Sequence, residues 1–255
     1  MAASEASALA ASNVVKRYGD RPALDGVTVS VARGEALGVV GESGSGKSTL
    51  ARVMVGLLAP DEGRVTAAGE EFDAGTTRGR AALRRHAQFV FQDAASAFNP
   101  RRTIGQSLEA PLVGLTRLGR AERRARVAEL LELVGLRADH ADRHPHEFSG
   151  GQLQRAGIAR ALGADPDVVV LDEPVSALDV SVQAQILALL KRLREERGLT
   201  MVFVSHDLAV VETLCDRVAV MRAGRIVEEG ACRAVLSTPR EDYTRALVAA
   251  AGRET

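Results

Sequence analysis

Residues 41–49, Gly-Glu-Ser-Gly-Ser-Gly-Lys-Ser-Thr, have the spacing with the clearest chemistry in this sequence. Gly41, Gly46, Lys47 and Ser48 fit the pattern G-x-x-x-x-G-K-[ST], whose glycines let backbone N–H groups converge on phosphate oxygens. A helix that starts here adds the positive end of its dipole. Lys47 is expected to reach the β- and γ-phosphates of a nucleotide, and the Ser48 hydroxyl to hold Mg²⁺. The loop therefore predicts a nucleoside triphosphate site.

The sequence around this loop has the context that the pattern needs. Residues 36–40 are an apolar run that predicts a buried strand, and residues 48–55 predict a helix. A Gly/Ser-rich turn with a solvated Lys47 is the alternative, and the strand–loop–helix context disfavours it. Only three of the 33 basic residues are lysines, and the rest are arginines. A lysine at position 47 agrees with a phosphate site, because its compact ammonium acts as a point charge among phosphate oxygens.

Two adjacent acids follow a second predicted strand. Residues 168–171, Val-Val-Val-Leu, suit a parallel strand covered on both faces, and Asp172 and Glu173 come just past its end. Ligands collect at the carboxyl ends of strands in open α/β sheets. Asp172 is expected to act on Mg²⁺ through coordinated water, and Glu173 to align and deprotonate the attacking water. Two acids that merely end a strand are the alternative.

Two other nucleotide chemistries lack their sequence signals. A GTPase is expected to carry an Asn-Lys-x-Asp guanine reader, and no lysine of this chain stands in such a sequence. A dinucleotide site of the Rossmann type needs a third glycine, whereas Gly44-Ser45-Gly46 is followed by Lys47.

Composition indicates a soluble globular protein with one large domain or two small ones. The chain is 46% hydrophobic and 26% charged, and its formal net charge is zero, so no nucleic-acid partner is expected. Cys215 and Cys232 are expected to be reduced thiols in a cytosol. Neither a signal peptide nor an apolar run near the roughly 18 residues of a spanning helix is found.

The elements that position these residues can be predicted from periodicity and turn signals. Strands are predicted at residues 12–15, 27–31, 63–67, 88–91, 201–204, 217–221 and 225–229. Helical segments are predicted within 103–163, at 181–197, from Asp207, and from 231 onward with Pro239 as an interruption. Residues 1–10 are expected to be frayed, Tyr18 to lie in the first turn, and Ser149 to cap a helix ending at Leu162.

This pattern predicts an α/β fold, a P-loop NTPase with a RecA-like parallel-sheet core, an N-terminal antiparallel β-subdomain and a helical insertion subdomain. A single domain is expected over about 10–250. Its core and β-subdomain would occupy about 10–91 and 165–230, its helical subdomain about 93–163, and its C-terminal helical tail 231–255.

Residues 148–152, Phe-Ser-Gly-Gly-Gln, are a second candidate phosphate platform, and they end twenty residues before Asp172. In the structural interpretation, Ser149 caps a helix behind two loop glycines. In the functional interpretation, the Ser149 hydroxyl and the Gly151 N–H are donors at a helix N-terminus. Since one platform already exists, the second is most simply used by a neighbouring chain.

At this loop the chain resembles the ATP-binding cassette family, and the resemblance covers nearly all 255 residues. It implies that Tyr18 stacks on adenine and that His206 touches the γ-phosphate. It also implies that Gln92 contacts Mg²⁺ or water and links to a membrane subunit. Residues 176–179, Ser-Ala-Leu-Asp, correspond to the family's D-loop. Phe148 replaces the more usual Leu, which should not alter the Ser-Gly-Gly backbone.

Together, motifs and resemblance define the expected site. The catalytic residues are Glu173, His206, Gln92 and Lys47. ATP contacts are expected from Tyr18, Gly41, Glu42, Ser43, Gly44, Ser45, Gly46, Lys47, Ser48, Thr49, Gln92, Ser149, Gly150, Gly151, Gln152, Asp172 and Asp179. Mg²⁺ contacts are expected from Ser48, Gln92 and Asp172. A metal site at His140, His144 and His146 is an alternative that needs convergent side chains, and a polar loop is favoured instead.

Three stretches and the tail are similar to the peptide/nickel importer branch of the family, namely residues 91–101, 144–152, 172–180 and 239–247. This similarity implies an ATPase subunit of an importer for peptides, nickel or a nickel chelate, peripheral at the cytoplasmic face of the inner membrane. The implied partners are a second ATPase subunit, identical or paralogous, transmembrane permease subunits and, indirectly, an extracytoplasmic substrate-binding protein. A soluble accessory ATPase, as in the phosphonate carbon–phosphorus lyase system, is the alternative. A DNA-repair or translation cassette is disfavoured.

Overall fold

Residues 7–252 are described by the computed structural model, in which the chain divides into two units. The first unit holds residues up to 89, then 167–173, and those from 193 onward. The second holds 90–166 and 174–192. Residues 174–192 thus cluster with the helical insertion, whereas the sequence analysis placed them in the core.

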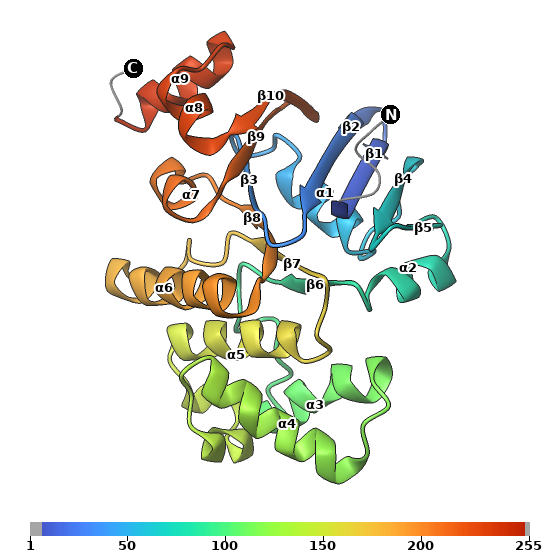
Figure 1. Ribbon diagram of the computed structural model, residues 1–255, viewed down its shortest axis with the longest axis vertical. Helices are drawn as coiled ribbons and strands as arrows, with labels where there is room; N and C mark the ends of the chain where they lie inside the picture. The colour runs from blue at the N-terminus through green and yellow to red at the C-terminus, as the bar shows by residue number, and fades with distance from the viewer. Residues whose placement is uncertain (1–6, 253–255) are drawn as a thin grey trace. The chain divides into compact units, whose positions relative to one another are not determined.

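A six-stranded sheet in the order β10-β9-β3-β8-β7-β6 is the centre of the first unit (Figure 1). Strands β3, β7, β8 and β9 run parallel, and β10 is antiparallel to β9. The strands are β3 (Ala36–Val40), β6 (Ala87–Val90), β7 (Val168–Asp172), β8 (Thr200–Val204), β9 (Arg217–Arg222) and β10 (Arg225–Ala231). Every residue of β3, β7 and β8 is buried, as continuous apolar runs in parallel sheets require.

A second sheet, β2-β1-β4-β5, is antiparallel throughout. Its strands are β1 (Ser7–Tyr18), β2 (Arg21–Ala32), β4 (Glu62–Ala67) and β5 (Glu70–Phe72). Residues 7–10 belong to β1 and are not frayed, and Tyr18 ends β1 instead of lying in the turn, so both expectations were wrong. Residues 1–6 and 253–255 lie outside the described residues. Pairing with two neighbours holds the Ala-rich start of β1 in a strand despite its weak propensity.

Among the residues of the first unit that the structure describes, the helices α1 (Lys47–Met54), α2 (Thr77–Leu83), α7 (Leu208–Leu214), α8 (Cys232–Ser237) and α9 (Asp242–Ala250) accompany these sheets. Helix α1 packs against β1, β2, β7 and β8. Leu50 and Met54 of α1 belong to one buried cluster with Val170 and Val202. This core fixes the start of α1, and with it the loop at residues 41–46.

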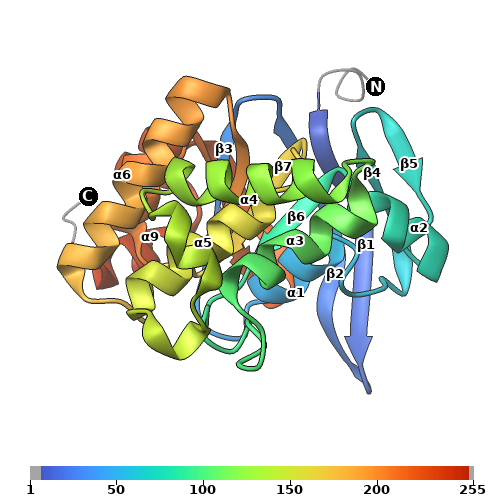
Figure 2. The same ribbon diagram turned by 90° about the horizontal axis from the view of Figure 1, so that it is seen from below.

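The second unit is helical, with α3 (Ile104–Leu115), α4 (Arg120–Leu133), two 3₁₀ turns (Ala138–Asp142 and Pro145–Glu147), α5 (Gly150–Leu162) and most of α6 (Val180–Arg197). Helices α3, α4 and α5 pack together (Figure 2). One face of α4 is apolar: Val127, Leu130 and Leu131 are buried, and so is Val134, which directly follows the helix.

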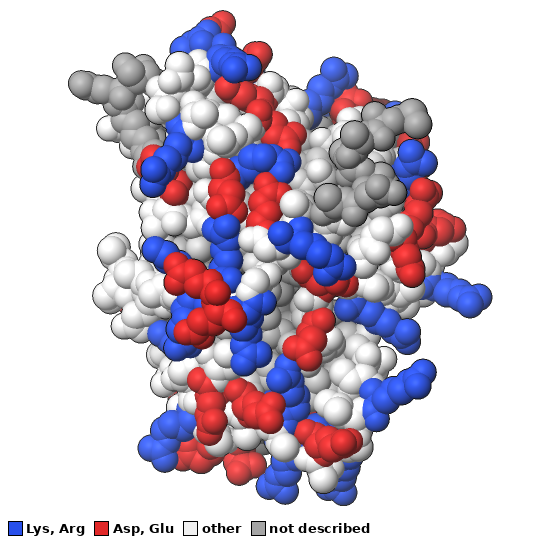
Figure 3. Space-filling view, viewed as in Figure 1, with Lys and Arg blue, Asp and Glu red and all other residues white. Residues whose placement is uncertain are grey.

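The distribution of charge and the hydropathy of the helices can be described for one face and for the described residues. Basic and acidic side chains are interspersed on the face in Figure 3, in keeping with the zero net charge. Within residues 7–252, no helix combines the length and apolarity needed to cross a bilayer.

Candidate functional site

The register of the parallel sheet brings three chain segments to one edge of the first unit. Val204 pairs with Val39 of β3 and with Asp172 of β7. The loop at 41–46, Glu173 and His206 therefore all follow strands that end side by side, which is where ligands bind in such sheets. Asp172 is the last residue of β7, whereas the sequence analysis placed it just after the end of the strand.

The glycines of the phosphate loop are required by close backbone contacts. Gly41 has φ 146°, and a Cβ there would lie 2.2 Å from the carbonyl oxygen of Met221. Gly46 has φ 107°, and a Cβ there would lie 2.4 Å from the carbonyl oxygen of Ala23. No other residue fits these positions without moving the backbone, because φ values in this range are reserved largely for glycine.

Lys47 is folded back onto the loop that precedes it. Its Nζ donates to the carbonyl oxygens of Gly41 at 2.7 Å and Glu42 at 2.8 Å, and the residue is 5% exposed. Burial lowers the pKa of Lys47, and the carboxylates of Glu173 and Asp172 oppose that shift. Phosphate oxygens are negatively charged and therefore bind an ammonium more strongly than neutral carbonyl oxygens do. We therefore expect Lys47 to exchange its two carbonyl partners for phosphate oxygens when a nucleotide binds.

Ser48, which is partly buried, and Asp172, which is buried, form a pair of oxygen ligands. The Ser48 hydroxyl donates to Asp172 Oδ1 at 2.8 Å, and Asp172 is 3% exposed. Burial raises the pKa of Asp172, while the hydrogen bond from Ser48 acts against it. Hydroxyl and carboxylate oxygens are the donors that Mg²⁺ prefers, so the pair fits that ion.

Glu173 has a strained backbone that points it toward His206. Its φ is 47°, a left-handed value that is uncommon for a side chain of this size. Its N–H continues the ladder of β7 by donating to the carbonyl oxygen of Val204 at 3.0 Å. Glu173 Oε2 lies 3.3 Å from His206 Nδ1, so the structure brings these two predicted catalytic residues together. Strain of this kind clusters at catalytic positions.

Tyr18, the predicted adenine-stacking residue, ends β1 in the same unit. The residue is 57% exposed, and it pairs with Arg21 across the turn to β2. Its ring is therefore accessible to a planar base, and stacking on adenine remains a prediction.

The second unit carries the other predicted residues. Ser149 caps α5 in a capping box: its Oγ accepts from the N–H of Gln152 at 3.3 Å, and Gln152 Oε1 accepts from the N–H of Ser149 at 3.0 Å. The predicted cap is thereby confirmed. The hydroxyl proton of Ser149 is not used in this box, so it can still donate to a phosphate.

Gln92 and Asp179 also lie in the second unit. Gln92 Nε2 donates to the Ser176 hydroxyl at 3.2 Å, so the predicted glutamine contacts the start of the 176–179 stretch. The carbonyl oxygen of Asp179 accepts from Val182 and Gln183 at the beginning of α6, and its side chain is exposed.

The three clustered histidines have structural roles in this unit. The ring of His140 is buried and meets Phe148 edge-on at 5.3 Å, directly before the capped helix. His144 and His146 stack on each other at 5.7 Å. No group of three or more metal-ligating side chains occurs among residues 7–252. Here the histidines support the loop that enters α5.

One contact of the phosphate loop has no counterpart in the sequence analysis. The N–H of Glu42 donates to the hydroxyl of Tyr243, on the last helix, at 3.1 Å. The tail was recognised only by its similarity to a family branch, and no spacing rule connects residues 201 positions apart.

A family model described as ABC transporter matches residues 24–176 of this chain. The dipeptide transport ATP-binding protein DppF of Haemophilus influenzae is 50% identical over 231 residues, which are 91% of this chain and 71% of DppF. A putative peptide import ATP-binding protein of Brucella abortus is 51% identical over 230 residues, covering 89% of this chain and 68% of that protein.

Two solved structures are similar over most of the chain. The ATP-binding cassette MJ0796, a dimer in a post-hydrolysis state with ADP and Pi, is 34% identical with a TM-score of 0.79, covering 88% of this chain and 99% of that one. CbiO1 from Clostridium perfringens, part of the ABC transporter complex cbiONQ, is 31% identical with a TM-score of 0.81, covering 92% of each chain. These similarities confirm the predicted fold class.

Proposed function

We propose that this chain, which belongs to the ABC transporter family, is the ATP-hydrolysing subunit that powers a membrane importer of peptides. The observation that carries the proposal is the grouping of Lys47, the Ser48–Asp172 pair and the Glu173–His206 pair at one edge of a sheet. Relatives near 50% identity that are named as dipeptide or peptide import ATP-binding proteins support the peptide cargo.

Each group of this edge has a role in hydrolysis. Lys47 leaves the Gly41 and Glu42 carbonyls for the β- and γ-phosphates of ATP. Ser48 and Asp172 would hold Mg²⁺, which neutralises charge on the phosphates when bound. Glu173 takes a proton from the attacking water, whose oxygen bonds to the γ-phosphorus as the bond to ADP breaks. His206, held beside Glu173, contacts the transferred phosphoryl group.

In this proposal a second ATPase subunit, identical or paralogous, completes the ATP site. Ser149 and the two glycines at the start of α5 present donors at a helix N-terminus, a further phosphate platform that the partner's ATP can use. Binding between two chains would make ATP favour a closed dimer that hydrolysis releases. Residues 92–100 would meet transmembrane permease subunits at the cytoplasmic face of the membrane, and an extracytoplasmic protein would deliver the peptide.

The role of Glu173 is tested by Glu173→Gln, which keeps the size of the side chain and removes the base. ATP binding should persist, while turnover should fall by about 10²-fold or more and closed dimer should accumulate in size-exclusion chromatography. Glu132→Gln, on the exposed face of α4, is the matched control and should hydrolyse at the wild-type rate. Unchanged turnover in Glu173→Gln would contradict the role of Glu173 as the base.

The role of Ser149 needs a control for its capping function. Ser149→Ala and Thr103→Ala each remove the Oγ of a capping box in the same unit, at a cost of about 1 kcal/mol of stability. Only Ser149→Ala should also abolish ATP-dependent dimerisation and lower turnover. Equal behaviour of the two variants would show that Ser149 acts as a cap alone.

Cargo and partners are tested by purification from the native host. Co-purification with hydrophobic permease subunits, and ATPase activity stimulated by peptide and its binding protein, are the expected results. Stimulation by nickel or a nickel chelate instead would redirect the cargo assignment. Recovery with soluble subunits alone would replace the importer by an accessory ATPase of a soluble complex.

A further inference from the structure

One peptide plane of the phosphate loop is held from both of its ends. The carbonyl oxygen of Gly41 accepts from Lys47 Nζ at 2.7 Å, and the N–H of Glu42 donates to the Tyr243 hydroxyl at 3.1 Å. These two groups belong to the same peptide bond, which is planar, so its C=O and N–H point in opposite directions. Any rotation of this plane would therefore break both hydrogen bonds.

The glycine before this plane makes it easy to rotate. Gly41 has φ 146°, in a region where the absence of a side chain leaves the backbone several alternatives. Lys47 cannot hold the plane during turnover, because it is needed by the phosphates of ATP. Tyr243 is the partner that remains when Lys47 leaves.

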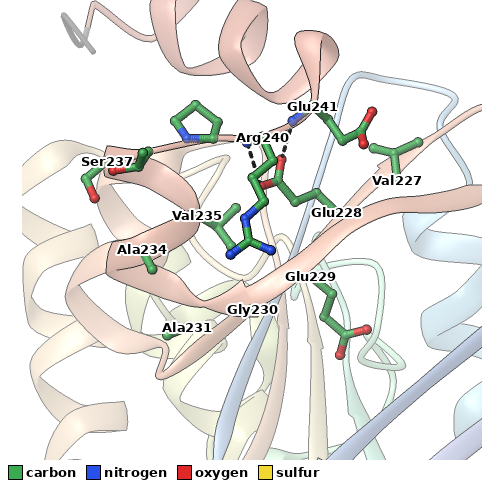
Figure 4. A pocket seen from close by; sticks show the side chains of 12 residues that line it. Val227, Glu228, Glu229, Gly230, Ala231, Ala234, Val235, Ser237, Arg240 and Glu241 are labelled. Atoms are coloured by element: carbon green, nitrogen blue, oxygen red, sulfur yellow. Dashed lines mark hydrogen bonds between the residues drawn. The ribbon is translucent and has the colours of Figure 1, made fainter.

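Tyr243 is itself fixed in place by the segment that leads into α9. Glu228 of β10 accepts from the N–H groups of Arg240 at 2.9 Å and Glu241 at 3.2 Å, beside a cavity of about 660 Å³ (Figure 4). These bonds anchor the start of α9 to the central sheet. The guanidinium of Arg222, at the end of β9, lies 4.9 Å from the centre of the Tyr243 ring.

We propose that Tyr243 is a positioning residue for the ATP site. Its hydroxyl keeps the 41–42 peptide plane in the orientation that presets the loop for a triphosphate, including after Lys47 turns to the phosphates. Helix α9 thereby becomes part of the nucleotide site through its contact with the 41–42 peptide plane. This inference rests on the proposed ATPase function and extends it to a helix far in sequence from the loop at 41–49.

Tyr243→Phe is the sharpest test, because it removes one oxygen and keeps the ring beneath Arg222. In the full chain, the dissociation constant for MgATP and the KM should rise by about two- to tenfold, the size of one hydrogen bond. The kcat should remain at its wild-type value, and the Tm of the nucleotide-free protein should fall by no more than the few degrees that one lost hydrogen bond explains. Asp242→Asn is the matched control on the same helix turn, because it removes the ion pair with Arg245 and spares Tyr243; it should leave the KM unchanged.

The outcomes separate this inference from the proposed function. If the wild type fails to bind MgATP, the proposed function fails. If the wild type binds MgATP and Tyr243→Phe binds it equally well, the inference alone is overturned. A rise in the KM of Asp242→Asn as large as that of Tyr243→Phe would also overturn it, because the loss would then follow from any change at the start of α9.

Discussion

Gly151 allows helix α5 to approach α6, and its replacement by alanine should therefore destabilise the protein. A Cβ at Gly151 would lie 2.3 Å from Cγ1 of Val182, whereas ordinary contact begins at 3.4 Å. The two helices must therefore separate by more than 1 Å, or Val182 must change its rotamer. Overpacking of this kind costs about 1–3 kcal/mol, and the higher helix propensity of alanine returns at most about 1 kcal/mol.

The measurement is a double-mutant cycle on thermal unfolding. Gly151→Ala should lower stability by up to about 2 kcal/mol, a Tm shift of roughly 2–8 °C for a chain of this size. In a Val182→Ala background the same change should be neutral or stabilising, which gives a coupling energy of about 1–3 kcal/mol. Gly150→Ala is the matched control, because its Cβ would make ordinary contact with Leu178 at 3.4 Å.

Equal losses from Gly151→Ala in both backgrounds would refute this reasoning. A loss from Gly150→Ala as large as that from Gly151→Ala would refute it as well. The ATPase rate of the double variant then adds information about the site. Restored stability without restored turnover would show that Gly151 also needs its bare backbone for the nucleotide, as the predicted phosphate platform requires.

Three further predictions concern the phosphate loop, the two cysteines and Asp61, and the first has a matched control. Gly41→Ala, whose Cβ would meet a carbonyl oxygen at 2.2 Å, should weaken binding of a fluorescent ATP analogue more than tenfold. Gly34→Ala, at φ 74° in open space, should cost only about 1 kcal/mol of stability and leave binding unchanged. Cys215 and Cys232 are both buried, and burial raises the pKa of Cys215. After treatment with an alkylating reagent, mass spectrometry should therefore find both thiols unmodified unless denaturant is added. Hydrogen bonds from a lysine ammonium and a backbone N–H lower the pKa of Asp61 from its ordinary value of 3.8, so its stabilisation is complete above that pH and is lost as pH falls further. The difference in unfolding free energy between wild type and Asp61→Asn should shrink on acidification, and a constant difference would contradict the assignment.

The chemistry of the first unit was predictable because its residues are local in sequence. The loop at 41–49 needs glycines, a lysine and a hydroxyl at fixed spacing, and the run before Asp172 is apolar enough to be a buried parallel strand. The cap at Ser149 was predictable for the same reason, since a capping box uses only neighbouring residues. Each of these features could be predicted from neighbouring residues alone, without knowing the order of strands in the sheet.

The antiparallel sheet was harder to predict because irregular pairing hides its alternation. Register shifts interrupt the β1–β2 ladder, and Asn13 has φ 51° where one occurs. Such bulges move side chains between faces, so a period of two cannot be followed across them. Short elements such as β5 and α2 were missed because three to seven residues give too little periodicity.

The contacts that set the geometry of the site are those that sequence reasoning cannot reach. Glu173 has a left-handed φ, and its N–H bonds to Val204, on a strand that begins 27 positions later in the chain. Its neighbour Asp172 faces Ser48 across 124 positions, and the loop itself meets Tyr243 across 201. Each of these bonds depends on the order of strands in the sheet, which no single motif encodes. The motifs therefore specify which groups react, whereas the sheet order decides that one carboxylate faces Ser48 and the next faces His206.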